Sequence, residues 1–239
     1  MTTILLGSGG FRTPERVAVW AGEIRAALGA ARRVLFVPYA LADHDGYLRT
    51  MVDRGLHAGY DLDGIHHSPD PVTAVHLAEA IFVGGGNTFR LLAALYRLGL
   101  LDPIRERIRA GVPYLGVSAG TNVACPTIRT TNDMPIVEPP SFTALELVPF
   151  QVNPHYYAGT NYVRQGDVLV EHFGETRDDR LREFHEENPT PVIGLWEGGV
   201  LRVVEGRISL IGANARVFRR GQPAIDVGPG AEIEPLLCG

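Results

Sequence analysis

Short apolar runs alternate with amphipathic stretches through the first half of the chain, and this alternation constrains the fold more than any other feature. Continuous apolar runs are typical of strands buried on both faces of a parallel sheet, while the stretches between them carry apolar residues at helical spacing. The predicted strands are Thr3–Gly7, Arg33–Pro38, Gly64–His67, Ala80–Gly84 and Tyr114–Val117, and the predicted helices are Pro14–Leu28, Asp45–Ala58, Pro71–Ala78, Thr88–Leu98 and Asp102–Ala110. With right-handed crossovers, this order predicts a doubly wound α/β sheet covered by helices on both faces.

The second half of the chain has a different pattern. Residues 127–154 are rich in Thr, Pro and Asn, so they are expected to form mostly loop with short strands. A charged helix is predicted over Thr176–Glu187, and short apolar runs from Pro191 to Phe218, separated by Gly and polar turns, predict antiparallel strands. Because no repeat or low-complexity linker interrupts the 239 residues, we expect residues 1–239 to form a single domain.

Charge and cysteine content exclude several classes of protein. The net charge is −5, and the 22 basic and 27 acidic residues are interspersed, so there is no basic stripe for a nucleic acid backbone. No segment reaches the roughly 20 apolar residues that span a bilayer. The two cysteines, Cys125 and Cys238, suit neither a zinc site nor a disulfide framework. We therefore expect a cytoplasmic protein without nucleic acid or membrane partners.

Ser118 lies in the turn Gly116-Val117-Ser118-Ala119-Gly120, between a predicted strand and a following helix. The pattern G-x-S-x-G in this context is typical of a nucleophile elbow, a strained turn that pushes the serine hydroxyl out of the sheet. The flanking glycines are needed because side chains there would collide with neighbouring backbone. The alternative is a plain Gly-Ser-Gly turn, and the pentapeptide alone does not decide between the two.

A second glycine-rich turn, Gly84-Gly85-Gly86-Asn87-Thr88, follows another predicted strand. It lacks both the Walker lysine and the full G-x-G-x-x-G pattern, which argues against a phosphate site. We interpret it as half of an oxyanion hole, with N–H groups from Gly86 and from Ala119. A simple strand-to-helix turn capped by Asn87 or Thr88 is the alternative, but both turns fall where open α/β sheets bind ligands.

A serine nucleophile needs a base and an acid that orients the base. His155 follows an apolar run and the turn Asn153-Pro154, whereas other histidines, among them His44, His66 and His67, lie in polar or helical contexts without special surroundings. Two acids are suitable partners, Asp133 and Glu197, and the residues alone do not choose between them. Arg177 could clamp a substrate carboxylate with two parallel hydrogen bonds, although surface salt bridges on a charged helix are the simpler reading.

Taken together, these residues resemble peptidase E, the α-aspartyl dipeptidase family of serine peptidases. The stretches that carry the resemblance are Val83–Phe89 (VGGGNTF), Gly116–Asn122 (GVSAGTN), Ala124–Val137 (ACPTIRTTNDMPIV), Gln151–His155 (QVNPH), Gly174–Arg177 (GETR) and Gly194–Gly198 (GLWEG). The resemblance runs from the first strand to Gly212. It departs in a longer segment between His155 and Gly174, and in Trp196, where proline is familiar.

The resemblance implies a flavodoxin-like αβα sandwich related to class I glutamine amidotransferases, and hydrolysis of dipeptides and some tripeptides with an N-terminal aspartate, without a metal or other cofactor. It implies Ser118 as nucleophile, His155 as base, Gly86 and Ala119 as oxyanion donors, and Asp133 or Glu197 as the orienting acid.

The resemblance also implies Arg177 as the reader of the aspartate side chain. Asn87 and Glu175 are further expected substrate-binding residues, and Asp133 or Glu175 would hold the α-amino group. A β-aspartyl or cyanophycinase-like peptidase, an esterase, and a non-catalytic binding protein are the alternatives. The expected partner is a small peptide, and the chain is expected to be a monomer or a homodimer.

Overall fold

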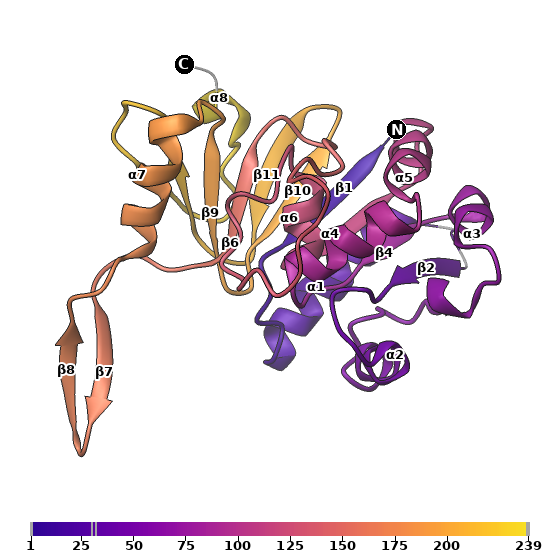
Figure 1. The fold of residues 1–239 in the computed structure, drawn as a ribbon, viewed down its shortest axis with the longest axis horizontal. Helices are drawn as coiled ribbons and strands as arrows, with labels where there is room; N and C mark the ends of the chain where they lie inside the picture. The colour runs from indigo at the N-terminus through magenta and orange to yellow at the C-terminus, as the bar shows by residue number, and fades with distance from the viewer. Residues whose placement is uncertain (1, 30, 32, 238–239) are drawn as a thin grey trace.

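A seven-stranded sheet forms the centre of the molecule, and it is parallel from its middle to one edge (Figure 1). The computed structural model describes residues 2–29, 31 and 33–237. The strands run in the order β11-β10-β1-β5-β4-β2-β3. The parallel strands are β1 (Thr3–Gly7), β2 (Arg33–Val37), β3 (Asp61–Gly64), β4 (Ile81–Val83) and β5 (Tyr114–Val117), and two antiparallel strands, β10 (Val200–Val204) and β11 (Arg207–Ile211), extend the sheet beyond β1.

Helices cover both faces of this sheet because successive strand residues point to opposite sides. Leu5, Phe36, Phe82 and Leu115 pack with α1 (Pro14–Leu28) and α2 (His44–Asp53). Leu6, Val37, Val83 and Tyr114 pack on the other side, with α3 (Pro71–Leu77), α4 (Thr88–Arg97), α5 (Leu101–Arg109) and α6 (Ala119–Ala124). The predicted α/β fold with a mostly parallel sheet is therefore confirmed.

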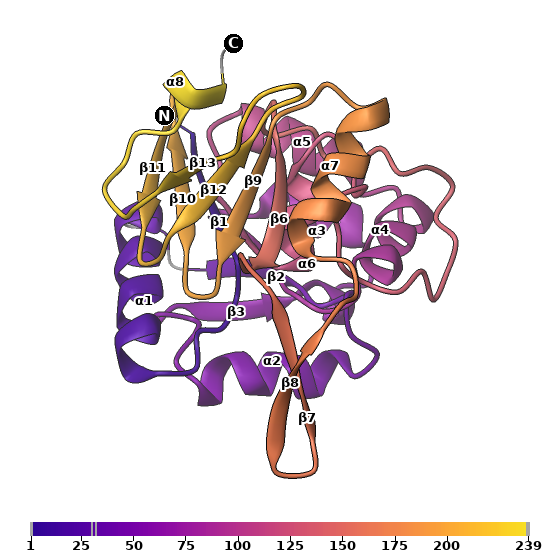
Figure 2. The same ribbon diagram turned by 90° about the vertical axis from the view of Figure 1, so that its left-hand side faces the viewer.

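A four-stranded sheet of order β13-β12-β9-β6 packs beside the antiparallel end of the large sheet (Figure 2). Its strands are β6 (Gln151–Tyr156), β9 (Val192–Trp196), β12 (Ala215–Phe218) and β13 (Ile225–Val227). Val152, Ile193 and Leu195 join the same buried cluster as Leu201 and Leu210 of the large sheet. Helix α7 (Arg177–Glu187) covers the opposite side through Leu181, and α8 (Glu234–Leu237) closes the described chain.

The antiparallel strands predicted between Pro191 and Phe218 are present, but they divide between the two sheets. Strands β9 and β12 pair in the small sheet, and β10 and β11 pair in the large one. In addition, β9 runs parallel to β6, a pairing between strands far apart in the sequence. Local patterning does not predict such a pairing, because it joins two segments that are far apart in the sequence.

A long hairpin, β7 (Asn161–Gln165) with β8 (Val168–His172), projects away from the body of the molecule in both ribbon views (Figures 1 and 2). This hairpin is the longer segment noted in the sequence between His155 and Gly174. No helix among the described residues is both long enough and apolar enough to cross a membrane.

Two predicted elements differ from the structure. The strand expected over Gly64–His67 lies at Asp61–Gly64, and Ile65–His67 form a short 3-10 helix, η1. The apolar signal was weak because β3 is an edge strand whose acidic residues alternate with Leu62. Helix α2 begins at His44 and ends at Asp53 instead of Ala58, because Gly55 and Ala58 take positive φ angles of 66° and 54° in the turn that follows.

Candidate active site

Ser118 forms a sharp turn between β5 and α6. Its backbone lies at φ 54° and ψ −108°, a conformation that costs a residue with a side chain on the order of 1–3 kcal/mol. A Cβ on Gly116 would lie 2.5 Å from the Gly120 carbonyl oxygen, and one on Gly120 would lie 2.1 Å from the Val83 oxygen. The expected reason for the flanking glycines therefore agrees with the geometry: backbone occupies the space of any side chain.

His155 lies on β6 at a bulge, where the pairing with β9 shifts register between Pro154 and Tyr156. Its φ is 55°, so the imidazole departs from the pattern in which successive side chains of a strand point to opposite faces of the sheet. The backbone N–H of His155 donates to the buried Ser8 hydroxyl at 2.8 Å, and Ser8 donates onward to the Leu195 carbonyl at 2.8 Å. His155 Nε2 lies 2.8 Å from Ser118 Oγ, within hydrogen-bond distance of the expected nucleophile.

Glu197 comes directly after β9 and faces the other nitrogen of the same ring. Its Oε1 lies 2.7 Å from His155 Nδ1. Because a carboxylate can only accept, Nδ1 carries the proton, and Nε2 is left to accept from the Ser118 hydroxyl. The hydrogen bond from His155 holds the pKa of Glu197 below its ordinary value; burial opposes this effect, and the charges of Arg16 and Arg12 add to it.

Asp133 lies away from the His155 ring, in the loop after α6. Its Oδ2 accepts from the N–H of Thr88 at 2.8 Å, from the Thr88 hydroxyl at 2.6 Å and from the Thr131 hydroxyl at 3.1 Å. The carboxylate thus anchors the loop after α6 to the start of α4. The neighbouring Asn132 donates to the Pro154 carbonyl at 2.7 Å, next to His155. Of the two acids left open by the sequence, the structure brings Glu197, and not Asp133, to the imidazole.

The two expected oxyanion donors lie in the two segments next to Ser118. Ala119 is the first residue of α6, and Gly86 lies in the loop after β4 at a φ of 132°. The backbone hydrogen bonds of the described residues outside helices and strands use neither amide as a donor. A Cβ on Gly85 would lie 3.1 Å from Ser118 Cβ, so this loop passes directly beside the serine.

Asn87, expected to bind substrate, instead uses its side chain within the fold. Its Oδ1 caps α4 by accepting from Arg90 N at 3.0 Å, and its Nδ2 donates to the Met134 carbonyl at 2.9 Å.

Arg177, at the start of α7, lines a cavity of about 590 Å³ together with His155, Trp196 and Glu197. Its guanidinium lies 5.5 Å from the Tyr157 ring centre, and its Nε is buried without a hydrogen-bond partner among the described residues. Burial lowers the pKa of Arg177. A partly desolvated cation that has no carboxylate partner among the described residues can bind an incoming anion.

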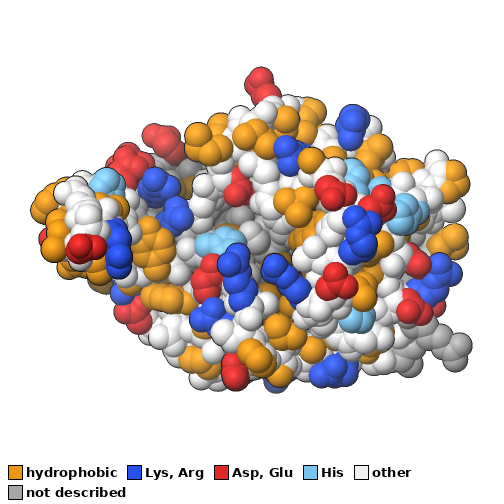
Figure 3. Space-filling model, turned by 90° about the horizontal axis from the view of Figure 1, so that it is seen from below, with side chains coloured by type: hydrophobic (Ala, Val, Ile, Leu, Met, Phe, Trp, Pro, Cys, Tyr) orange, Lys and Arg blue, Asp and Glu red, His pale blue; other side chains and the backbone are white. Residues whose placement is uncertain are grey.

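Glu175 lies beside Arg177 in a second cavity, at the base of the β7–β8 hairpin, and pairs with Arg180 at 3.4 Å. Figure 3 shows that the face seen from below in Figure 1 is hollowed near its centre, where acidic, basic and histidine side chains gather.

One segment of the site was missed by sequence reasoning, the loop Ser8-Gly9-Gly10 after β1. A Cβ on Gly9 would lie 2.6 Å from His155 Cε1, and one on Gly10 would lie 2.2 Å from Glu197 Oε2. This loop therefore shapes the space in which the histidine and the glutamate meet. Its signal was a Gly-Ser-Gly-Gly run at the end of the first predicted strand, the position at which the other two site loops were found.

Side chains of metal-ligating type meet at one further place among the described residues, where Asp45, His66 and His67 converge. None of them belongs to the Ser118 site. Cys125 is fully buried in the core, and Cys238 lies outside the described residues.

A serine, a histidine and a glutamate joined by hydrogen bonds at the carboxyl ends of parallel strands define a serine hydrolase of the α/β class. Comparison with known proteins places the chain within that class. The model of peptidase family S51 matches residues 3–211, and the chain belongs to this family. The predicted resemblance is therefore confirmed over nearly the range expected, and the chain is a serine-type peptidase.

The names of individual relatives agree with this family assignment. Peptidase E of Streptomyces coelicolor is 52% identical over 88% of this chain and 84% of its own length. A Drosophila melanogaster protein named "Probable alpha-aspartyl dipeptidase" is 49% identical over 86% of this chain and 84% of its own length. A crystal structure of a peptidase from an acI-B1 actinobacterium has the same fold, with a TM-score of 0.67 at 18% identity, covering 98% of this chain and 96% of that one.

Proposed function

We propose that this protein is a dipeptidase that cleaves dipeptides and some tripeptides after an N-terminal aspartate, through an acyl-enzyme on Ser118. The observation that carries the proposal is the chain of hydrogen bonds from Ser118 Oγ to His155 Nε2 and from His155 Nδ1 to Glu197 Oε1, at 2.8 and 2.7 Å. The names of the relatives, peptidase E and α-aspartyl dipeptidase, support the choice of substrate.

The reaction proceeds in two halves on this geometry. Ser118 Oγ attacks the carbonyl carbon of the aspartyl residue while its proton passes to His155 Nε2, and the Gly86 and Ala119 amides hold the oxyanion. Collapse of this intermediate breaks the C–N bond, and the proton on Nε2 goes to the leaving amine. Water then attacks the acyl-enzyme, gives a proton to Nε2 and releases aspartate, and that proton returns to Ser118 Oγ. Glu197 stabilises the imidazolium in both halves.

Arg177 is the proposed reader of the aspartate side chain. It shares a cavity with His155, stacks on Tyr157 and has its buried Nε without a partner among the described residues. A guanidinium in this state matches a carboxylate with two parallel hydrogen bonds, which a lysine cannot reproduce. Glu175, in the adjoining cavity, is the acidic side chain that we assign to the α-amino group.

We also propose that residues 1–239 act as one catalytic domain. Ser118 follows β5 of the seven-stranded sheet, whereas His155 lies on β6 and Glu197 follows β9, both strands of the four-stranded sheet. Neither sheet alone supplies the proposed catalytic set, which supports a single functional unit.

Cleavage of a panel of dipeptides tests the proposal. Asp-Leu should be hydrolysed far faster than Asn-Leu, Glu-Leu, β-Asp-Leu or a nitrophenyl ester. Ser118→Ala should lose on the order of 10⁴–10⁶ in turnover. Arg177→Lys should raise KM for Asp-Leu and narrow the preference over Asn-Leu, while Arg182→Lys, a matched change on the exposed side of the same helix, should do neither.

Three outcomes would contradict the proposal. Hydrolysis of Asp-Leu by Ser118→Ala at the rate of the unaltered protein would exclude an acyl-enzyme intermediate on Ser118. Preference for β-Asp-Leu would make the protein a β-aspartyl peptidase. Failure to react with any of these substrates or with a serine-directed probe would make it a binding protein.

A further inference from the structure

Two neighbouring histidines converge on one carboxylate at a distance from the Ser118 site. Asp45 lies in the first turn of α2, and His66 and His67 form the end of η1, directly after β3. Asp45 Oδ1 lies 3.1 Å from His66 Nε2 and 2.7 Å from His67 Nε2. One ligand atom from each of the three side chains falls within 4.8 Å of the others. No local sequence pattern predicts this cluster, because Asp45 and His66 are 21 positions apart.

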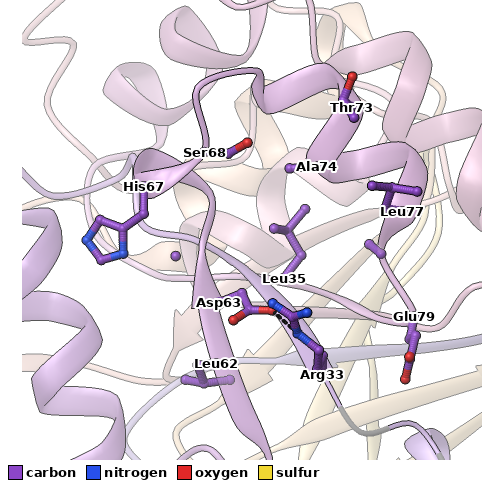
Figure 4. Close-up of a pocket in the computed structure, with 12 residues that line it drawn as sticks. Arg33, Leu35, Leu62, Asp63, His67, Ser68, Thr73, Ala74, Leu77 and Glu79 are labelled. Atoms are coloured by element: carbon purple, nitrogen blue, oxygen red, sulfur yellow. Dashed lines mark hydrogen bonds and ion pairs between the residues drawn. The ribbon is translucent and has the colours of Figure 1, made fainter.

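The arrangement is held by the fold on one side and open to solvent on the other. The His66 side chain is only 12% exposed, and its ring occupies space that a Cβ on Gly64 would fill, 2.4 Å from His66 Cε1. The Asp45 and His67 side chains are 61% and 57% exposed, so an ion can reach them from solution. His67 also lines a pocket together with Thr73 and Leu77, and Figure 4 shows its ring at the edge of that pocket, pointing away from these two residues.

We propose that Asp45 Oδ1, His66 Nε2 and His67 Nε2 bind a divalent transition metal of the Zn²⁺ type, with solvent completing the coordination. Two imidazoles and one carboxylate are a ligand set that Zn²⁺ accepts, whereas Mg²⁺ and Ca²⁺ require more oxygen ligands. Zinc bonds of about 2.0–2.2 Å in a tetrahedron place ligand atoms roughly 3.3–3.6 Å apart. The Asp45 contacts, at 2.7 and 3.1 Å, need to open by only a fraction of an ångström.

A metal here would join the segments that follow β2 and β3. The loop leading from β2 into α2 also contacts the loop beside Ser118, since the Ala40 carbonyl accepts from Asn87 N at 2.9 Å. The site is nevertheless separate from the proposed catalytic residues. We therefore assign the ion a structural role, binding the start of α2 to η1, and not a role in hydrolysis.

Metal binding by the untagged full-length protein tests the proposal directly. Zn²⁺ would be titrated in competition with a chromophoric chelator, and Co²⁺ would be added as a spectroscopic probe of coordination. We expect one Zn²⁺ per chain, a Co²⁺ spectrum with nitrogen ligands, and a Zn²⁺-dependent rise in Tm. Asp45→Asn and His67→Ala should each weaken Zn²⁺ binding by at least about tenfold, the usual cost even of losing a residue that only supports a ligand.

Two controls separate this site from other histidines. His76→Ala changes an exposed histidine on α3, and His155→Ala removes the histidine of the proposed catalytic set; both should bind Zn²⁺ as the unaltered protein does. Unchanged Zn²⁺ affinity in Asp45→Asn and His67→Ala would overturn the proposal, as would loss of binding in His155→Ala alone. Tm values measured without metal would show that the variants are folded.

Discussion

The substitution Glu197→Gln tests how the imidazole is oriented, because it removes a charge while keeping the size of the side chain. In the native arrangement the carboxylate accepts from Nδ1 at 2.7 Å and leaves Nε2 free to accept from Ser118. A neutral amide can instead donate to Nδ1 and so favour the wrong tautomer. It also cannot stabilise the imidazolium that forms as Ser118 attacks.

The size of the effect follows from the geometry and the exposure. Opposite charges about 4 Å apart attract by about 4 kcal/mol at an effective dielectric constant of about 20. The Glu197 side chain is 44% exposed, so solvent screening reduces this to about 2–3 kcal/mol. That energy alone corresponds to roughly 30- to 150-fold in rate. The tautomer effect adds to it, so we expect kcat to fall by about 10²–10⁴.

Asp133→Asn is the matched variant, since Asp133 is the other acid that the sequence allowed. Its carboxylate receives hydrogen bonds from Thr88 and Thr131 and none from His155. We expect a lower Tm and a kcat within a few-fold of the unaltered protein. Steady-state hydrolysis of Asp-Leu, with the labelling rate of a serine-directed probe as a second readout, measures both variants. The reasoning is refuted if Glu197→Gln keeps its kcat while Asp133→Asn loses it.

Three further predictions concern packing and titration. Gly120→Ala should destabilise the protein by about 1–3 kcal/mol or more because its Cβ meets backbone, whereas Gly22→Ala on the exposed side of α1 should stabilise it by roughly 0.5–1 kcal/mol; equal shifts in thermal melts would contradict this. Burial raises the pKa of Cys125 to about 12, so a Cys238→Ser variant should react with Ellman's reagent at pH 8 only after unfolding, and rapid native labelling would count against it. Hydrogen bonds from Thr176 lower the pKa of Asp179 to about 2, so the stability that this carboxylate contributes is present above its unfolded pKa near 4 and is lost as pH falls towards 2. Asp179→Asn should accordingly lower Tm at pH 7 and have a much smaller effect near pH 2.

The parallel half of the fold was predictable because each buried strand is a continuous apolar run followed by a helical pattern. The bounds of β3 were predicted wrongly because an edge strand needs only one covered side, so Asp61 and Asp63 can alternate with Leu62. Ser118 and the Gly84–Gly86 loop were singled out because two glycine-rich turns that follow buried strands fall where open α/β sheets bind ligands.

The acid that faces His155 was not predictable, because the sequence around Asp133 and the sequence around Glu197 both suit an acid that contacts a histidine. What separates them is the parallel pairing of β6 with β9, which places the end of β9 beside His155. The same holds for Asp45 and His66, which meet only because α2 and β3 are neighbours in space. Local patterns predict which turns are unusual, whereas the pairing of distant segments decides which side chains face each other.

The two residues at the centre of the proposed reaction, Ser118 and His155, both have positive φ angles, 54° and 55°. Each conformation costs on the order of 1–3 kcal/mol, so neither would persist unless the surroundings determined it. Ser118 is fixed by its N–H, which donates to the Gly7 carbonyl at 2.9 Å, and His155 by its N–H, which donates to the Ser8 hydroxyl at 2.8 Å. Gly7 is the last residue of β1 and Ser8 directly follows it, and β1 lies between the parallel and antiparallel parts of the large sheet. The end of β1 therefore holds both strained residues, and through them it sets the distance across which the proton of the serine would move.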